Sequence, residues 1–179
     1  MTLDLDWPLV GRAAELDRVA GALARPDCSG VVLTGEGGVG KTRLANECLG
    51  LAEQSGFATA RAVATRSTAS ITLGALAPLL PDLGDRSLNL LGAAREALAE
   101  RAGTNPLLLF VDDAHLLDEV SAALLLQIAA DRHIFVLVTL RSSAETSRWR
   151  DSTGTVGGVR TAALMRWLQR FRRAPRRRR

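Results

Sequence analysis

The stretch that decides the fold of this chain is Gly35-Glu36-Gly37-Gly38-Val39-Gly40-Lys41-Thr42. It matches the pattern G-x-x-x-x-G-K-[ST], in which glycines let a loop fold closely around phosphate groups. Lys41 is the only lysine in a chain with 22 arginines. A compact ammonium fits between phosphates better than a planar guanidinium fork does. The stretch therefore predicts a site for a nucleoside triphosphate.

The sequence on either side of this stretch supplies the context that the pattern requires. A short apolar run at 30–34 predicts a buried parallel strand, and residues 42–54 carry apolar side chains at helical spacing. Backbone N–H groups at the start of that helix are expected to point at the phosphates. Lys41 is expected to reach the β- and γ-phosphates, and the Thr42 hydroxyl to bind Mg²⁺. The predicted phosphate-binding residues are Gly35, Gly37, Gly38, Val39, Gly40, Lys41, Thr42 and Arg43.

The rest of the chain alternates helical and strand patterns. Helices are predicted over 12–25, 73–80, 88–102 and 118–130, and strands over 57–63, 107–111 and 134–140. This alternation, with apolar strands, predicts an α/β fold: a three-layer P-loop NTPase around a mostly parallel sheet. A fifth core strand is not evident, because residues 155–159 form only a weak candidate. The strand at 30–34 is therefore predicted to lie at an edge of the sheet.

Charged residues follow two of the predicted strands. Asp112 and Asp113 come after an apolar strand, whose carboxyl end is where α/β sheets bind ligands. Asp112 is predicted to hold Mg²⁺ through water. Asp113 is predicted to orient or deprotonate the attacking water, the alternative being a cap on the next turn. Arg141 is predicted to contact the γ-phosphate, the alternative being a solvated charge. His115 and His133 stand alone and are interpreted as structural.

Composition limits the class of protein. The chain has 179 residues, of which 47% are hydrophobic, and this is typical of one globular domain. No apolar run is long enough to span a membrane, and the acidic N-terminus does not resemble a secretory signal. Cys28 and Cys48 have no metal-binding spacing and are interpreted as reduced thiols. These features predict a cytoplasmic protein without a transmembrane segment.

The charge is distributed unevenly along the chain. Residues 1–141 hold 12 basic and 17 acidic residues, a net of −5, whereas residues 142–179 hold 11 basic and 2 acidic residues, a net of +9. We therefore divide the chain into a nucleotide-binding domain, 1–141, and a basic, Arg-rich tail, 142–179, expected to be poorly ordered. The tail has a second interpretation as a basic amphipathic helix that meets nucleic acid, an acidic partner or a membrane surface. Its apolar positions are Leu164, Trp167, Leu168 and Phe171.

Four segments together resemble one protein family: 8–15, 35–42, 108–118 and 139–141. Residues 8–141 resemble the nucleotide-binding domain of the STAND branch of AAA-related ATPases. More narrowly, they resemble the N-terminal ATPase domain of large ATP-binding LuxR-type transcriptional regulators. The first segment, from Pro8 to Glu15, is similar to the family's hhGRxxE motif. The resemblance implies that Val10 and Gly11 contact the adenine of ATP.

The resemblance implies a nucleotide switch that binds ATP with Mg²⁺ and hydrolyses it weakly. In the family, a fifth core strand, a helical lid, a winged helix, sensor repeats and a helix-turn-helix follow, and none is recognisable after Arg141. A shifted reading frame in GC-rich DNA would produce such Arg-rich sequence, so we expect a truncated member. Two alternatives remain open: a nucleic-acid-binding protein that uses the tail, and a non-functional remnant. The oligomeric state is open as well.

Overall fold

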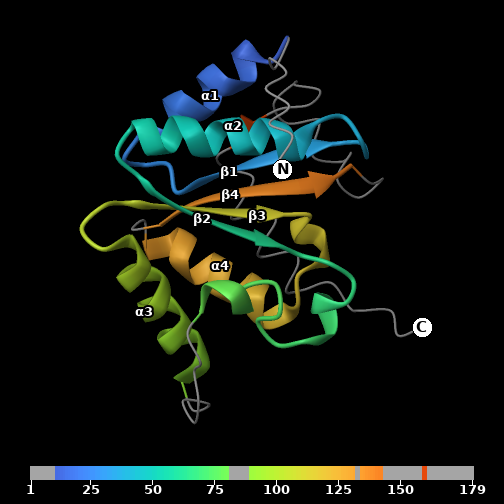
Figure 1. Cartoon of the computed structure of the whole chain (residues 1–179), viewed down its shortest axis with the longest axis vertical. Helices are drawn as coiled ribbons and strands as arrows, with labels where there is room; N and C mark the ends of the chain where they lie inside the picture. The colour runs from blue at the N-terminus through green and yellow to red at the C-terminus, as the bar shows by residue number, and fades with distance from the viewer. Residues whose placement is uncertain (1–10, 81–88, 132–133, 143–158, 161–179) are drawn as a thin grey trace, which may run out of the picture.

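A parallel sheet lies between two layers of helices in the computed structural model, which describes residues 11–80, 89–131, 134–142 and 159–160. Helices α1 (Ala13–Leu23) and α2 (Lys41–Gln54) cover one face of the sheet (Figure 1). Helices α3 (Leu90–Ala102) and α4 (Glu119–Asp131) cover the other face. The predicted three-layer α/β architecture is confirmed.

The sheet has the strand order β2-β3-β4-β1-β5. Four of these strands are parallel, so their carboxyl ends meet at one edge. The register pairs Val63 with Asp112 and Gly35 with Arg141, which brings the predicted phosphate loop and both acidic residues to that edge. The strands are β1 (Gly30–Gly35), β2 (Ala58–Val63), β3 (Leu107–Asp112), β4 (Ile134–Arg141) and β5 (Val159–Arg160).

The two central strands, β3 and β4, are apolar on both sides because helices cover both faces of the sheet. Leu108 and Phe110 pack in the cluster that holds α1 and α2. Leu107, Leu109 and Val111 pack in the larger cluster on the side of α3 and α4. Side chains alternate along a strand, so Asp112 belongs to the α2 side. The packing of the apolar side chains of β3 therefore places the Asp112 carboxylate on the side of the sheet where α2 lies.

The predicted place of β1 at the edge of the sheet is wrong. Val32 and Leu33 pair antiparallel with Arg160 and Val159, so β1 lies between β4 and the two-residue strand β5. The weak candidate strand at 155–159 overlaps β5 only at its last residue, and residues 143–158 lie outside the described part of the chain. Among the described residues, the fifth position of the sheet holds a short antiparallel strand rather than a parallel core strand.

The predicted helix at 73–80 is also wrong, because the structure has only a 3-10 helix at Ala77–Leu79 there. Leu73 adopts a left-handed backbone with φ of 55°, and its N–H donates to Asp118 Oδ1 at 3.3 Å. The same Asp118 oxygen accepts from the backbone N–H groups of Val120 and Ser121, each at 3.0 Å. The backbone hydrogen bonds within 73–80 run from an N–H to the carbonyl three residues earlier, so this segment forms 3-10 turns instead of an α-helix.

The predicted amphipathic helix of the tail, Val10 and His133 all lie outside the described residues. Within the described residues, none of the helices has the length and apolar character needed to cross a membrane.

Candidate functional site

The loop between β1 and α2, residues 36–40, is exposed. Gly38 and Gly40 have φ of 80° and 83°, a left-handed conformation that favours glycine. Helix α2 starts at Lys41, and no side chain caps its first turn. The first N–H groups of a helix have no acceptor inside the helix, and together with the helix dipole they bind anions. A Cβ placed on Gly37, Gly38 or Gly40 would meet nothing within 4 Å, so the loop has room for phosphates.

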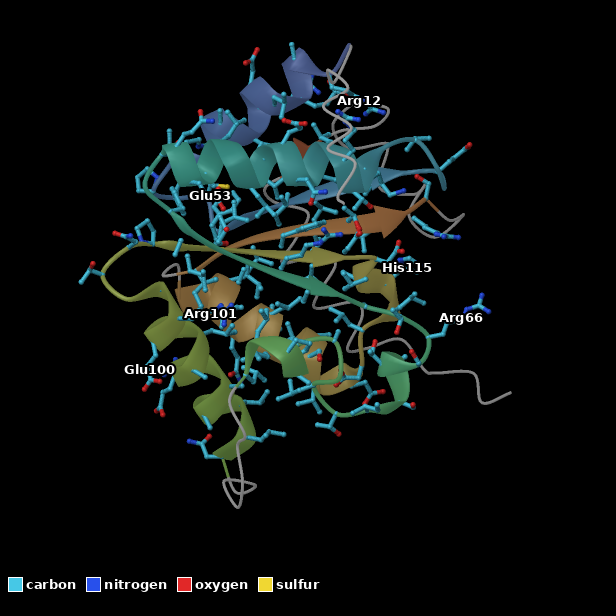
Figure 2. The ribbon with its side chains drawn as sticks, in the orientation of Figure 1. Arg12, Glu53, Arg66, Glu100, Arg101 and His115 are labelled. Carbon is cyan, nitrogen blue, oxygen red and sulfur yellow. The ribbon has the colours of Figure 1, made fainter. Side chains whose placement is uncertain are left out.

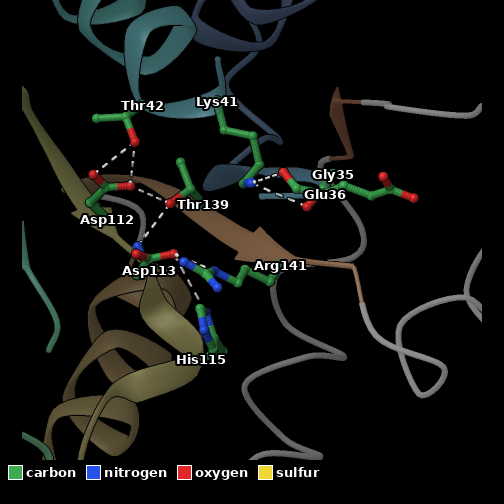
Figure 3. Close-up of polar contacts among 9 residues, drawn as sticks. All are labelled: Gly35, Glu36, Lys41, Thr42, Asp112, Asp113, His115, Thr139 and Arg141. Atoms are coloured by element: carbon green, nitrogen blue, oxygen red, sulfur yellow. Dashed lines mark hydrogen bonds and ion pairs between the residues drawn. The ribbon is translucent and has the colours of Figure 1, made fainter. Parts of the chain in front are cut away.

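Lys41 lies against its own loop. Its Nζ donates to the carbonyl oxygens of Gly35 at 3.1 Å and Glu36 at 2.7 Å (Figure 3). Burial lowers the pKa of Lys41, and the charge of Asp113 opposes this shift. The two acceptors are neutral, so phosphate oxygens can replace them without leaving a charge unpaired.

The start of α1 is attached to the same loop. Arg12 Nη2 donates to the carbonyl oxygen of Val39 at 2.7 Å, and Arg12 Nη1 donates to Glu15 Oε1 at 3.2 Å. Gly11, with φ of 80°, immediately precedes this contact. The segment predicted to meet the adenine is thus connected to the loop predicted to meet the phosphates.

Three elements converge on the carboxylate of Asp112. The Thr42 hydroxyl, at the start of α2, lies 3.1 and 3.0 Å from the two carboxylate oxygens. The Thr139 hydroxyl, on β4, donates to Oδ1 at 2.5 Å (Figure 3). No cluster of three or more His, Cys, Asp or Glu side chains suited to a metal exists among the described residues. A cation between Thr42 and Asp112 would therefore take its other oxygen ligands from phosphates and water, as Mg²⁺ commonly does.

The Asp113 carboxylate lies near two basic side chains, those of His115 and Arg141. Its Oδ1 lies 3.8 Å from His115 Nδ1 and 4.0 Å from Arg141 Nε. Its backbone is left-handed, with φ of 50°, and its N–H donates to the Thr139 hydroxyl at 2.8 Å. Burial lowers the pKa of His115, and the charge of Asp113 opposes this shift. Thr139 therefore connects both acidic residues through one hydroxyl.

Comparison with known proteins identifies the family. Residues 8–139 match the AAA ATPase domain. The chain belongs to the AAA ATPase domain family. Membership of this family implies that the protein binds nucleotide. No curated protein sequence matches the chain.

The AAA domain is similar in structure to a crystal structure of a DNA replication initiation factor. The TM-score is 0.53 at 16% sequence identity, over 95% of this chain and 46% of that one. The chain therefore spans about half the length of that protein. At this identity the likeness shows the fold, which agrees with the sheet and helix layers described above.

The structure brings the residues predicted to meet the phosphates and Mg²⁺ together at one edge of the sheet. Lys41, Thr42, Asp112, Asp113 and Arg141 all belong to the cluster in Figure 3. Gly35, Gly37, Gly38, Val39 and Gly40 form the loop beside them, and Arg43 follows in the first turn of α2, with its Nε buried and without a hydrogen-bond partner.

Three contacts of this AAA domain are not predicted by the sequence patterns above. The sequence assigns Thr139 only to a motif next to Arg141, yet its hydroxyl joins Asp112 and Asp113. His115, interpreted as isolated, lies beside Asp113. Arg61 on β2 lies 3.8 Å from Asp112. The alternation of side chains along β4 puts Thr139 on the side of Phe135 and Leu137, and this signal was available in the sequence.

Proposed function

We propose that this AAA domain binds ATP with Mg²⁺ and acts as a nucleotide switch in a STAND/LuxR-type signalling or transcriptional regulator. The observation that carries the binding part is the convergence of Thr42, Asp112 and Thr139 next to Lys41. The regulator part is supported by the four sequence segments that resemble that family. The contact from Arg12 to Val39 adds to this support, because it joins two of those segments.

Each residue of the cluster has a proposed part in binding. Lys41 exchanges its carbonyl acceptors for β- and γ-phosphate oxygens, and the N–H groups from Gly38 to Arg43 hold the phosphates. Thr42 and Asp112 hold Mg²⁺, which neutralises phosphate charge when it is bound. Thr139 keeps the Asp112 carboxylate oriented through its short hydrogen bond. Val10 and Gly11 are proposed to contact the adenine.

Weak hydrolysis is proposed to depend on Asp113 and Arg141. Asp113 would orient the attacking water or accept its proton, and Arg141 would contact the γ-phosphate. The hydrogen bond from Asp113 N–H to Thr139 fixes the backbone at this position, and the ion pair with Arg141 places both side chains on the same side of the cluster. Arrival of a γ-phosphate would give Arg141 a further anionic partner.

Calorimetric titration with ATP tests the binding site, with Mg²⁺ and with EDTA. In Asp112→Asn we expect the Mg²⁺-dependent gain in affinity to disappear, while binding in EDTA stays near the parental value. Asp27→Asn is the matched control, because Asp27 is an exposed acid whose carboxylate pairs with Arg25 at 2.5 Å. If Asp112→Asn keeps the full Mg²⁺ effect, the proposed cation site is wrong.

A hydrolysis assay separates the two interpretations of Asp113. In Asp113→Asn we expect ATP affinity to stay unchanged and turnover to fall, because the amide cannot accept a proton from water. Turnover at the parental rate would mean that Asp113 serves only as the residue that begins the following turn, Ala114–Leu116.

A second candidate function, nucleic-acid binding through the Arg-rich tail, is favoured by the net charge of +9 over residues 142–179. The truncation should follow Arg160, because β5 pairs with β1 and needs to be kept. For this candidate we expect the shortened chain to bind ATP normally and to lose salt-dependent DNA binding. DNA binding that survives the truncation would exclude residues 161–179 as the nucleic-acid element.

A further inference from the structure

One positively charged side chain near the proposed Mg²⁺ site, that of Arg61, has no part in the function proposed above. Arg61 lies on β2, at the edge of the sheet, and pairs in register with Phe110 of β3. Its neighbours Ala60 and Ala62 are buried in the cluster on the side of α3 and α4. Side chains alternate along a strand, so Arg61 belongs to the α2 side, as Asp112 does.

The guanidinium of Arg61 is held by two contacts. Its Cζ lies 5.6 Å from the centroid of the Phe110 ring, and its Nη2 lies 3.8 Å from Asp112 Oδ2. The Arg61 side chain is 44% exposed, whereas that of Asp112 is 10% exposed. An arginine at an edge strand is free to extend into water, but this one stacks on an aromatic face and turns to the carboxylate.

Among the described residues, Arg61 is the only ion-pair partner of Asp112 within 4.0 Å. The other two partners of the carboxylate, Thr42 and Thr139, are neutral hydroxyl groups. Without a divalent cation, Arg61 balances the charge of Asp112. When a divalent cation is bound, the positive charge of Arg61 lies close to it and repels it.

We propose that Arg61 is a positioning residue that lowers the affinity of the Asp112 site for divalent cations, so that Mg²⁺ binds well only together with nucleotide phosphates. The proposal rests on the proposed function, because it requires Asp112 to help hold Mg²⁺. Nucleotide phosphates supply the negative charge that outweighs Arg61. A cation without nucleotide is disfavoured at this site.

The ratio of the ATP Kd in EDTA to the ATP Kd in Mg²⁺ measures this effect, since it reports the coupling between cation and nucleotide on the protein. In Arg61→Gln we expect the ratio to fall roughly three- to thirtyfold, because Mg²⁺ then binds near Asp112 without nucleotide and gains less from the phosphates. Arg61→Lys keeps the charge and should stay near the parental ratio. In Asp112→Asn the additional change Arg61→Gln should have no effect on the ratio.

Arg66→Gln is the matched control. Arg66 follows β2, is exposed, and points away from the sheet (Figure 2), so its loss changes the net charge equally without contact to Asp112. A purely structural role of Arg61 would shift both Kd values equally and leave the ratio unchanged.

Two outcomes would overturn the proposal while the proposed function stands. One is an unchanged or higher ratio in Arg61→Gln when Asp112→Asn abolishes the parental Mg²⁺ effect. The other is an equal fall in Arg66→Gln, which would mean that net charge alone acts. If Asp112→Asn itself leaves the Mg²⁺ effect intact, the proposed function fails, and the proposal about Arg61 fails with it.

Discussion

The phosphate loop and the acidic strand end are organised in opposite ways. In the phosphate loop, residues 35–42, Lys41 donates to backbone carbonyls and the glycines border open space. In the acidic strand end, which consists of Asp112, Asp113 and Thr139, one buried hydroxyl joins both acidic residues. The difference indicates that the cation side is organised before ligand binds, whereas the phosphate side gains its main partners from the ligand. Changes in the acidic strand end should therefore alter stability, and changes in the phosphate loop should alter affinity.

The largest expected effect is on affinity in the phosphate loop. Lys41→Ala removes a charge-assisted contact to phosphate, at a cost of roughly 1.5–3 kcal/mol, or about tenfold to a hundredfold in Kd for ATP-Mg²⁺. The free energy of unfolding of this variant without ligand should change little, because Lys41 makes hydrogen bonds only to carbonyls of its own loop. Calorimetry gives the affinity and urea unfolding the stability, with Arg66→Ala as a control that removes one exposed positive charge. Unchanged affinity would exclude the phosphate-loop assignment.

The next effect is on stability at the acidic strand end. Thr139→Val keeps the shape of a fully buried side chain but removes its hydroxyl, so the N–H of Asp113 loses its acceptor. We expect a loss of about 1–3 kcal/mol in the free energy of unfolding without ligand. Urea unfolding measures it.

Thr34→Val is the matched control for Thr139→Val. Thr34 lies on the neighbouring strand β1, opposite Leu140, and its hydroxyl makes no hydrogen bond within the described residues. The same substitution there should change stability by less than about 0.5 kcal/mol. Equal losses in both variants would mean that the hydroxyl of Thr139 is not what organises the acidic strand end.

These two regions also differ in how well the sequence predicted them. The phosphate loop is continuous in sequence, so its glycines, Lys41 and Thr42 could be assigned from one local pattern. The acidic strand end depends on which residues of separate strands face each other. Asp112 was identified from its own strand, but its contacts with Thr139 and Arg61 follow from the register of β4 and β2 against β3.

Long-range contacts explain the fold errors as well. The helix expected at 73–80 is replaced by 3-10 turns, and Leu73, which has a left-handed backbone, donates its N–H to Asp118, 45 positions away. The strand β5 was not predicted because two residues carry too little pattern for recognition, and only its pairing with Val32 and Leu33 defines it. By contrast, the strands β1, β3 and β4 were found because each contains a continuous apolar run, whereas β2 alternates buried alanines with exposed positions such as Arg61.

A smaller effect tests whether the phosphate loop needs its left-handed backbone. Gly40→Ala places a side chain at φ of 83°, which costs roughly 1–2 kcal/mol in stability. Gly37→Ala is the control, because Gly37 lacks a positive φ and its added Cβ would meet no atom within 4 Å. Urea unfolding of both variants gives the difference. Equal stability of the two would mean that the loop changes its backbone easily, and that it is less defined than the acidic strand end.

The smallest expected effect is a pH dependence at His115, beside the acidic strand end. Burial lowers the pKa of folded His115, whereas the unfolded chain keeps the ordinary value of about 6.5. Between these two values the unfolded state binds more protons, so the stabilisation from neutral His115 is complete above that ordinary value and is lost as pH falls. The free energy of unfolding of the parent, minus that of His115→Gln, should therefore decrease between about pH 7.5 and 5.5. In an Asp113→Asn background the decrease should be steeper, because the carboxylate that favours the imidazolium is gone while Arg141 and Lys41 still oppose it. A difference that stays constant with pH would show that His115 titrates alike in both states, and that Asp113 cancels the effect of burial.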